Sequence, residues 1–334
     1  MPAHLYPTTR RKFLAGAGTT MAAVATGNLL ADDPKVDPDL WALLSDTHLL
    51  SAESIERHYG SQRAAREKRA STVSVNFDRA AAQVNAMPQN PAGLILNGDC
   101  VHVGGREEYD QLADKFALIE SPPIHVTMGN HDHRGDFARA FGEGSRAGGR
   151  RLLENRHVSL VRSRRANFVL LDSLTMKTPD RPVKGPGILG AEQLDWLESV
   201  LDSEADKPAI VVMHHNIDPS AEYEQRAGTK QLLLESAGPV QKIAGLEDTD
   251  RLLDLLHAKP QVKAVVTGHR HQGRIFQWRK LHFIHLPAVG YTLDPKETEA
   301  WLQLRLRDSG AEVKLRTLDP KHARSGKRIE LKWS

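Results

Sequence analysis

The 334-residue sequence contains a single cysteine, Cys100. One cysteine excludes an internal disulfide bond, and it also excludes any zinc site built from several thiolates. Cys100 lies within a motif described below, where we expect a small buried side chain and not a reactive thiol. A chain of this length is long enough to bury a full hydrophobic core in one large domain or two medium ones.

The sequence also lacks a long hydrophobic run. A membrane-spanning helix needs about 20 strongly apolar residues, and the most apolar candidate, residues 15–25, is shorter and rich in Gly, Ala and Thr. We therefore expect no membrane span. A hydrophobic content of 40% and a charged content of 26% are typical of a globular protein.

A surplus of charge is missing as well. The formal net charge is +3, but residues 1–31 hold three basic residues and no acidic ones, which leaves 42 basic and 42 acidic residues in the remainder. A balanced charge argues against a protein that coats nucleic acid or lies on a membrane surface. Nucleic acid is therefore an unlikely partner.

The first 31 residues are predicted to be a targeting signal. The segment Thr9-Arg10-Arg11-Lys12-Phe13-Leu14-Ala15 precedes a run of small residues that contains cleavage-like sequences ending at Ala25 and Ala31. It resembles a twin-arginine export signal, which implies the twin-arginine export machinery as a partner and a periplasmic or extracellular location; a general secretory signal is the alternative. We expect a linker at 32–38, one catalytic domain at 39–318 and a basic tail at 319–334.

Five blocks of Asp, Asn and His each follow a segment predicted to be a strand. They are Asp46-Thr47-His48, Gly98-Asp99, Gly129-Asn130-His131-Asp132, His214-His215 and Gly268-His269-Arg270-His271. Open α/β sheets place their sites at the carboxyl ends of strands, so the blocks are expected to meet there. Carboxylates, amides and imidazoles are metal ligands, and a histidine beside a ligand can donate a proton near neutral pH. Each block alone is also ordinary turn chemistry.

As an ordered set, the five blocks resemble the calcineurin-like metallophosphoesterase superfamily. The segments around them look most like the bacterial cyclic-nucleotide and glycerophosphodiester phosphodiesterases. The resemblance implies a four-layer α/β/β/α sandwich with two mixed β-sheets. It also implies two metal sites: one held by Asp46, His48, Asp99 and His271, and a second held by Asp99, Asn130, His214 and His269.

The resemblance further implies hydrolysis of a small phosphoester by a hydroxide that bridges two metals about 3.5–4 Å apart. His131 is then expected to stabilise charge or protonate the leaving oxygen, with Asp132 holding its orientation. The expected substrate contacts are His102, His215, Asn216 and Arg270. Asn216 departs from the proline usual in that family. The tyrosine ligand of purple acid phosphatases is replaced by His102, which disfavours that class.

Several alternatives stay open at this level. Asp, Asn and His suit iron, manganese and zinc alike, either divalent or trivalent. A phosphomonoesterase or nucleotidase, a nuclease, and a non-catalytic binding module are rival functions to the phosphodiesterase, and the oligomeric state is unknown. Three segments outside the blocks are also assigned: a basic and polar solvated excursion at 51–69, an arginine-rich, partly irregular surface or anion-attracting rim at 146–165, and a lid or rim loop without a long regular element at 217–247.

Overall fold

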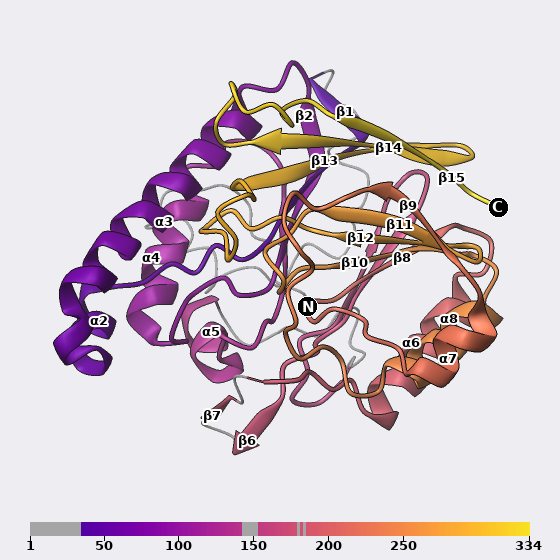
Figure 1. Cartoon of the computed structure of the whole chain (residues 1–334), viewed down its shortest axis with the longest axis horizontal. Helices are drawn as coiled ribbons and strands as arrows, with labels where there is room; N and C mark the ends of the chain where they lie inside the picture. The colour runs from indigo at the N-terminus through magenta and orange to yellow at the C-terminus, as the bar shows by residue number, and fades with distance from the viewer. Residues whose placement is uncertain (1–34, 142–152, 179–180, 183–184) are drawn as a thin grey trace, which may run out of the picture.

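The computed structural model describes residues 35–141, 153–178, 181–182 and 185–334 (Figure 1). The expected export signal and residues 32–34 of the expected linker lie outside the described residues. The first strand, β1, begins at Val36, so the last three residues of that linker belong to a sheet. Among the described residues, no helix combines the length and apolarity that crossing a bilayer requires.

The first sheet has six strands in the order β15-β14-β13-β1-β2-β3, with β1, β2 and β3 parallel and the remaining pairs antiparallel. Their bounds are β1 Val36–Leu44, β2 Asn90–Asn97, β3 Ile124–Thr127, β13 Ala300–Arg307, β14 Gly310–Thr317 and β15 Arg328–Lys332. The predicted basic tail at 319–334 contains a strand, β15, near its end. Ile329 and Leu331 of β15 point into the core, and this alternation is the strand signal that the short segment carries.

The second sheet has seven strands in the order β4-β5-β8-β10-β12-β11-β9, with β5, β8, β10 and β12 parallel. Their bounds are β4 Ser159–Arg162, β5 Asn167–Leu170, β8 Ala209–Val212, β9 Lys230–Leu234, β10 Val262–Thr267, β11 Arg274–Trp278 and β12 Leu281–His285. A small separate hairpin joins β6 Met176–Thr178 to β7 Arg181–Pro182.

Helices cover the outer face of each sheet (Figure 1). The first sheet is covered by α3 Arg63–Asn85, α4 Arg106–Phe116 and α5 Arg134–Phe141, with α2 Ala52–His58 and the 3₁₀ turn η1 Gly60–Gln62 beyond them. The second sheet is covered by α6 Ala191–Ser203, α7 Ala221–Ala227 and α8 Thr249–Ala258.

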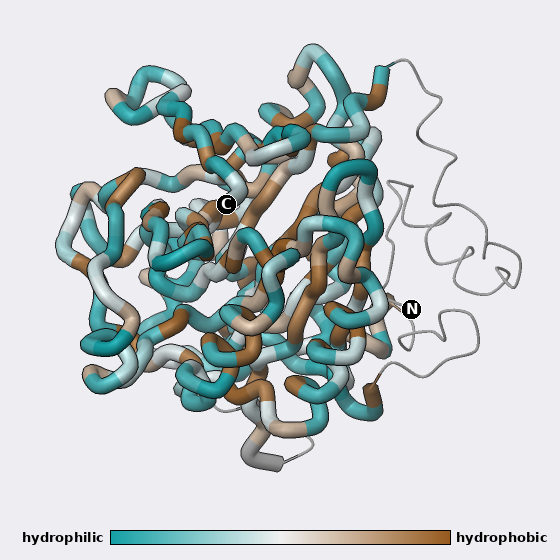
Figure 2. Tube along the Cα trace, turned by 90° about the vertical axis from the view of Figure 1, so that its right-hand side faces the viewer, coloured by the Kyte–Doolittle hydropathy of each residue, from teal (hydrophilic) through white to brown (hydrophobic). Residues whose placement is uncertain are grey.

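Side-chain alternation along β1 explains the layering. Leu40, Ala42 and Leu44 pack against the helices of the first layer, whereas Trp41 and Leu43 pack against the other sheet. Three buried apolar clusters result, one between the sheets and one under each helical layer. Figure 2 shows the hydrophobic stretches gathered inside the molecule and the hydrophilic ones on outer turns. The predicted four-layer α/β/β/α sandwich with two mixed sheets is confirmed.

Two segments outside the blocks contain regular elements that the sequence analysis did not assign. Residues 51–69 form α2 and the first turns of α3, because Ser51 caps α2 and the Ala, Arg, Glu and Lys residues that follow are strong helix formers. Residues 217–247 include α7, capped by Ser220, and β9, which pairs with β11 at a sheet edge. Local polarity hid these elements, since each is short or faces solvent along much of its length.

Candidate active site

The five blocks lie together at one end of the two sheets. Each follows the carboxyl end of a parallel strand: β1, β2 and β3 in the first sheet, and β8 and β10 in the second. Three groups of side chains there bring their ligand atoms within 4.8 Å of one another. One group is His48, His102 and His131, of which only His48 is a predicted ligand. The other two groups are Asp46, His48 and His271, and Asp99, His214 and His269. The members of these last two groups are six of the seven residues predicted to hold metal, and the seventh, Asn130, is buried in the same loop as His131.

Asp99, a member of the group with His214 and His269, also lies close to His48 of the other group. Its Oδ2 is 3.5 Å from Nε2 of His48 and 3.3 Å from Nε2 of His214, which belong to different groups. Asp46 Oδ1 is 3.3 Å from Nε2 of His271. A carboxylate oxygen that faces both groups is the geometry required of a ligand shared by two metals.

The remaining oxygens of the two carboxylates are held by the protein. Ser45 donates its hydroxyl hydrogen to Oδ2 of Asp46 at 2.6 Å, and the backbone N–H of His269 donates to the same atom. The backbone N–H of His131 donates to Oδ1 of Asp99 at 2.8 Å. Each carboxylate is therefore fixed by one oxygen and presents the other to the histidines, as outer hydrogen bonds do for metal ligands.

The histidines are oriented in the same way by backbone carbonyls. Nδ1 of His214 lies 2.9 Å from the Asn97 oxygen, and Nδ1 of His271 lies 2.6 Å from the Tyr291 oxygen. His269 uses Nε2 instead, at 3.0 Å from the Ala244 oxygen. These contacts fix the tautomers, leaving Nε2 of His214 and His271 and Nδ1 of His269 as lone-pair donors.

Three inward-facing atoms have no hydrogen-bond partner although they are buried: Oδ1 of Asp46, Oδ1 of Asn130 and Nε2 of His214. A buried polar atom without a partner costs free energy. All three are electron-pair donors in the predicted ligand set, so bound cations would satisfy them. The residues present therefore fit two metal ions, and their oxygen and nitrogen atoms suit iron, manganese or zinc.

The electrostatics suit the same role. Burial lowers the pKa of His48 well below its usual value and that of His269 to about 4, so both imidazoles are neutral and able to ligate. Burial also acts to lower the pKa of His214, but the carboxylates of Asp99 and Asp46 raise it to about 10. The two carboxylates thus favour positive charge at this position, which a bound cation would supply.

The backbone at the ligands is unusual. Asp46, His48, Asp99, His269 and His271 all have positive φ, between 46° and 69°. Residues with a Cβ rarely adopt this conformation, and they keep it only where the surroundings impose it. Here it turns consecutive side chains toward one point at the strand ends.

Gly129 packs directly against the ligand Asp99, with no room for a side chain. A Cβ on this residue would lie 2.3 Å from Oδ1 and 2.4 Å from the backbone N of Asp99. We expect Gly129→Ala to displace Asp99, lower the metal content and reduce turnover about 10²-fold, although no ligand is changed. Gly273→Ala is the matched control, since its Cβ would meet nothing closer than 3.6 Å. Equal metal content and turnover in both variants, by elemental analysis and kinetics, would contradict the expectation.

The orienting role predicted for Asp132 was wrong. Its carboxylate accepts hydrogen bonds from the Gly129 N–H at 2.9 Å, from two further backbone amides and from the Tyr109 hydroxyl. Nδ1 of His131 instead lies 2.6 Å from the carbonyl oxygen of His102. The turn after His131 directs Asp132 beneath the loop, where burial and the charge of Asp99 raise its pKa to about 7. Asp132 therefore holds the loops together, and the His102 carbonyl orients His131.

The four predicted substrate contacts lie around the cluster in different ways. His102 stacks on His131 with ring centroids 4.9 Å apart. His215 is buried, with Nδ1 at 2.8 Å from the Ser173 hydroxyl and Nε2 at 3.2 Å from the Gly185 oxygen, so both ring nitrogens contact the protein. Asn216 and Arg270 both donate to the carboxylate of Asp218. The structure thus brings His102 to the cluster and gives the other three residues protein partners.

Two supporting residues were missed by sequence reasoning. The carbonyl oxygen of Asn97 lies 2.7 Å from the Ser45 hydroxyl and 2.9 Å from Nδ1 of His214, while its side-chain amide donates to the Met213 oxygen and so joins the two sheets. Asn97 is the last residue of its strand, immediately before Gly98. A polar residue at the end of an apolar run was the feature of the sequence that could have indicated its supporting role. The ring of Tyr291 lies 4.8 Å from that of His271 and 5.0 Å from that of His48. Nothing in its local sequence marks it.

The arginine-rich segment does not approach the metal ligands in the part that the structure describes. Arg162 pairs with Glu204, and Arg164 and Arg165 pair with Asp39 near the start of β1, which is the opposite end of that strand. Arg156 donates to the Leu174 oxygen. Arg146, Arg150 and Arg151 lie outside the described residues. Of the two interpretations, the described arginines match the solvated surface.

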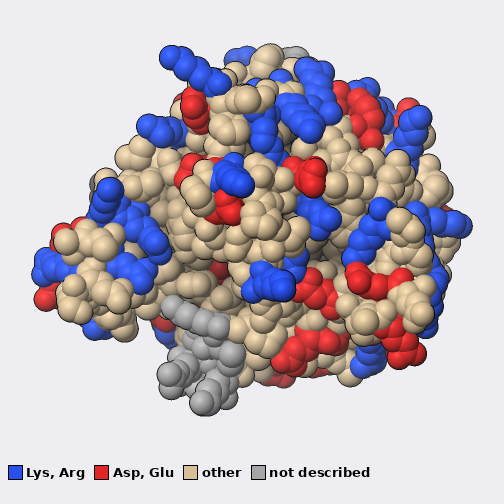
Figure 3. Space-filling view, viewed as in Figure 1, with Lys and Arg blue, Asp and Glu red and all other residues tan. Residues whose placement is uncertain are grey.

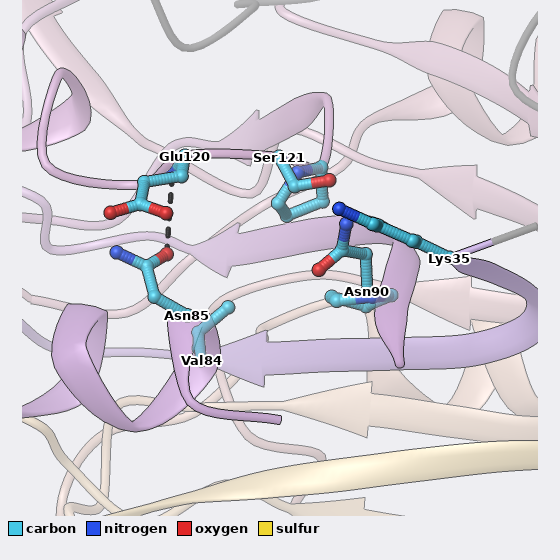
Figure 4. A pocket seen from close by; sticks show the side chains of 8 residues that line it. Lys35, Val84, Asn85, Asn90, Glu120 and Ser121 are labelled. Carbon is cyan, nitrogen blue, oxygen red and sulfur yellow. Dashed lines mark hydrogen bonds between the residues drawn. The ribbon is translucent and has the colours of Figure 1, made fainter. Parts of the chain in front are cut away.

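One cavity of the described structure lies away from this site. A cavity of about 300 Å³ lies between the end of α3 and the starts of β1 and β2 (Figure 4). Lys35 and Asn90 line one side and Asn85 and Glu120 the other. Because the histidine cluster lies at the opposite ends of these strands, the cavity has no part in it.

Paired cation sites that share a carboxylate are the arrangement with which metal-dependent hydrolases clamp a phosphoryl group. Residues 42–273, more than half of the chain, match the model of the calcineurin-like phosphoesterase family. The chain belongs to this family, and it is a hydrolase of phosphoester bonds.

Individual relatives are more distant. A probable cyclic nucleotide phosphodiesterase of Synechococcus is 27% identical over 71% of this chain and 81% of its own length. A probable glycerophosphodiester phosphodiesterase of Arcobacter nitrofigilis is 29% identical over 59% of this chain, which spans 63% of that relative. The crystal structure of a dimetal phosphatase from Danio rerio superposes with a TM-score of 0.60 at 16% identity, covering 89% of this chain and all of that one. This last likeness concerns the fold.

Proposed function

We propose that the protein is a phosphodiesterase that hydrolyses small phosphodiesters with two metal ions, each iron, manganese or zinc. When bound, the ions supply Lewis-acid stabilisation of the phosphoryl oxygens and lower the pKa of a coordinated water. The observation that carries the proposal is the placement of Oδ2 of Asp99 between the two histidine groups. The names of the relatives, which are phosphodiesterases, support the substrate class.

His131 is assigned the protonation of the leaving oxygen. Its Nδ1–H donates to the His102 carbonyl, so the ring is fixed with Nε2 as the nitrogen that can carry a second, transferable proton. His131 also lies against His48, with ring centroids 4.7 Å apart, which places it beside the ligands. A group in this position can reach an ester oxygen without itself holding a metal.

The charges near the ligands favour a diester over a monoester. A monoester dianion gains from extra cations around the phosphoryl group, whereas a diester has one negative charge. The guanidinium of Arg270, which stands between two ligand histidines in the sequence, is paired with Asp218. Burial lowers the pKa of His215 well below its usual value, so this residue adds no positive charge.

We therefore expect a higher kcat/KM for a nitrophenyl phosphodiester than for the matching monoester when both are measured with the same metal. The physical reason is that Arg270 is already paired with Asp218 and His215 is uncharged, so neither residue compensates the second negative charge of a monoester. Nitrophenol release from both substrates, over a range of concentrations, gives the comparison. A monoester favoured by tenfold or more, about 1.4 kcal/mol of transition-state binding, would reject the diester assignment and leave the metal chemistry intact.

We also propose that the protein is exported by the twin-arginine route, on the basis of Arg10-Arg11 followed by Phe13-Leu14. Replacing both arginines by lysine keeps the charge and removes the paired guanidinium groups. The expected result is accumulation in the cytoplasm, measured by cell fractionation. Unchanged export of the double variant would instead favour the general secretory route.

A further inference from the structure

The inward-facing side of helix α3 is apolar toward its C-terminal end and basic toward its N-terminal end. Val73 and Phe77 are fully buried and belong to the core under the first sheet. Extending the helical spacing toward the N-terminus leads to Arg69 and Arg66, which are only half-buried. Two arginines thus occupy the positions where this side of the helix leaves the core and passes the histidine cluster.

Arg66 lies against the outer side of this cluster. Its guanidinium carbon is 4.4 Å from the centroid of the Tyr59 ring, and its Nη1 is 3.4 Å from Nε2 of His102. His102 is the residue whose carbonyl orients His131. Arg66 is therefore one imidazole away from the group assigned to the leaving oxygen.

Arg69 lies one turn further along and reaches a second ring. Its guanidinium carbon is 4.5 Å from the centroid of Tyr291, whose ring contacts His48 and His271. Tyr59, Arg66, Arg69 and Tyr291 form a continuous arc beside the ligands of one metal, which we call the arginine arc. Stacking on tyrosine fixes each guanidinium plane. Nη2 of Arg66 also donates to Oε1 of the exposed Gln62 side chain at 3.1 Å, a contact that an oxyanion could replace.

The arginine arc carries uncompensated positive charge. Within the described part of the chain, neither Arg66 nor Arg69 forms an ion pair, whereas Arg63 on the same helix pairs with Glu56 and Glu67. The carboxyl of Glu108 acts electrostatically on Tyr59, and its Oε2 accepts hydrogen bonds from the backbone N–H groups of Val103 and Gly104. Figure 3 shows Lys and Arg side chains gathered over this end of the molecule, around α2 and the adjoining end of α3.

We infer that the arginine arc is a subsite for a second anionic group of the substrate, so that the preferred substrates are phosphodiesters whose other substituent bears a carboxylate or a further phosphate. This inference rests on the proposed phosphodiesterase activity and specifies its substrate class. Guanidinium edges bind both oxyanions through paired N–H donors. The imidazoles of His48, His102 and His271 stand between the arc and Asp99, so the arginines address the substituent and not the reacting phosphorus.

The test compares three nitrophenyl phosphodiesters whose second alcohol is methyl, carboxypropyl or phosphoethyl, assayed by nitrophenol release with metal-loaded protein. We expect kcat/KM to be about tenfold or more higher for an anionic ester than for the methyl ester, mainly through KM. The preference should weaken as ionic strength rises. Whichever anionic ester is preferred identifies the group that the arc binds.

Substitutions then locate the preference. In Arg66→Gln/Arg69→Gln the ratio of anionic to methyl ester should fall to about one, and in the corresponding lysine variant it should be intermediate because charge remains without the planar fork. Arg63→Gln removes one positive charge from the same helix and should keep the ratio. Equal kcat/KM for all three esters in the unmodified protein, or a preference that survives the double glutamine change, overturns the subsite. No turnover of any diester while a monoester is hydrolysed would instead reject the proposed function.

Discussion

Asp99→Asn should abolish nearly all hydrolysis, at least about 10³-fold, and lower the occupancy of both metal sites. Oδ1 of Asp99 accepts the His131 N–H, and Oδ2 faces His48 and His214. An asparagine that keeps the first hydrogen bond turns its NH₂ group toward the ligand nitrogens, where a cation would be. Losing a shared anionic ligand removes several kcal/mol of transition-state stabilisation.

Elemental analysis and turnover of a generic phosphodiester measure this result. Asp254→Asn is the control, because Asp254 is an exposed carboxylate on α8 that forms an ion pair with Arg226 and lies outside the five blocks. Circular dichroism of both variants shows whether the fold is kept. Two metals per chain together with normal turnover in Asp99→Asn would contradict its role as the shared ligand.

His131→Ala should keep both metals and lower kcat by about 10²- to 10⁴-fold for substrates with a poor leaving group. The ring is held by the His102 carbonyl and is not needed for the unpartnered ligand atoms of Asp46, Asn130 and His214. Nitrophenolate leaves without a proton, so a nitrophenyl diester should lose far less activity than an alkyl diester. This difference between leaving groups is the signature of a general acid.

Kinetics with an alkyl and a nitrophenyl diester, together with metal analysis, separate the possible roles of His131. His58→Ala, at the exposed end of α2, is the control for the loss of a histidine side chain away from the ligands. Loss of metal in His131→Ala would make this residue a ligand. Equal losses with the two leaving groups would assign it to charge stabilisation instead of proton transfer.

The strand positions and the meeting of the five blocks were predictable from short-range patterns in the sequence, whereas the four-layer sandwich was implied by the family resemblance. Apolar runs such as the one ending at Leu44 mark strands, and the polar residues that follow each parallel strand must collect at one edge of the sheets. The family resemblance then ordered these blocks correctly, since the match covers residues 42–273.

Other features depend on where distant segments meet. Tyr291 follows no motif, and it reaches His48 only because the strand order carries the loop after β12 back to the end of β1. Arg66 and Arg69 lie in a segment whose polarity suggested solvent, and only the path of α3 shows that they face the cluster. The direction of Asp132 was mispredicted because neighbours in sequence were assumed to touch, whereas the turn sends its carboxylate to the amides of Cys100 and Val101.

The central claim is that the two histidine groups around Asp99 hold two ions that act together. Titration of the metal-stripped protein with manganese or zinc, following binding by calorimetry and turnover of a phosphodiester in the same samples, tests it most directly. The account predicts saturation at two ions per chain, with full activity only once the second site is filled. Saturation at a single ion, or undiminished turnover in the metal-stripped protein, would contradict it.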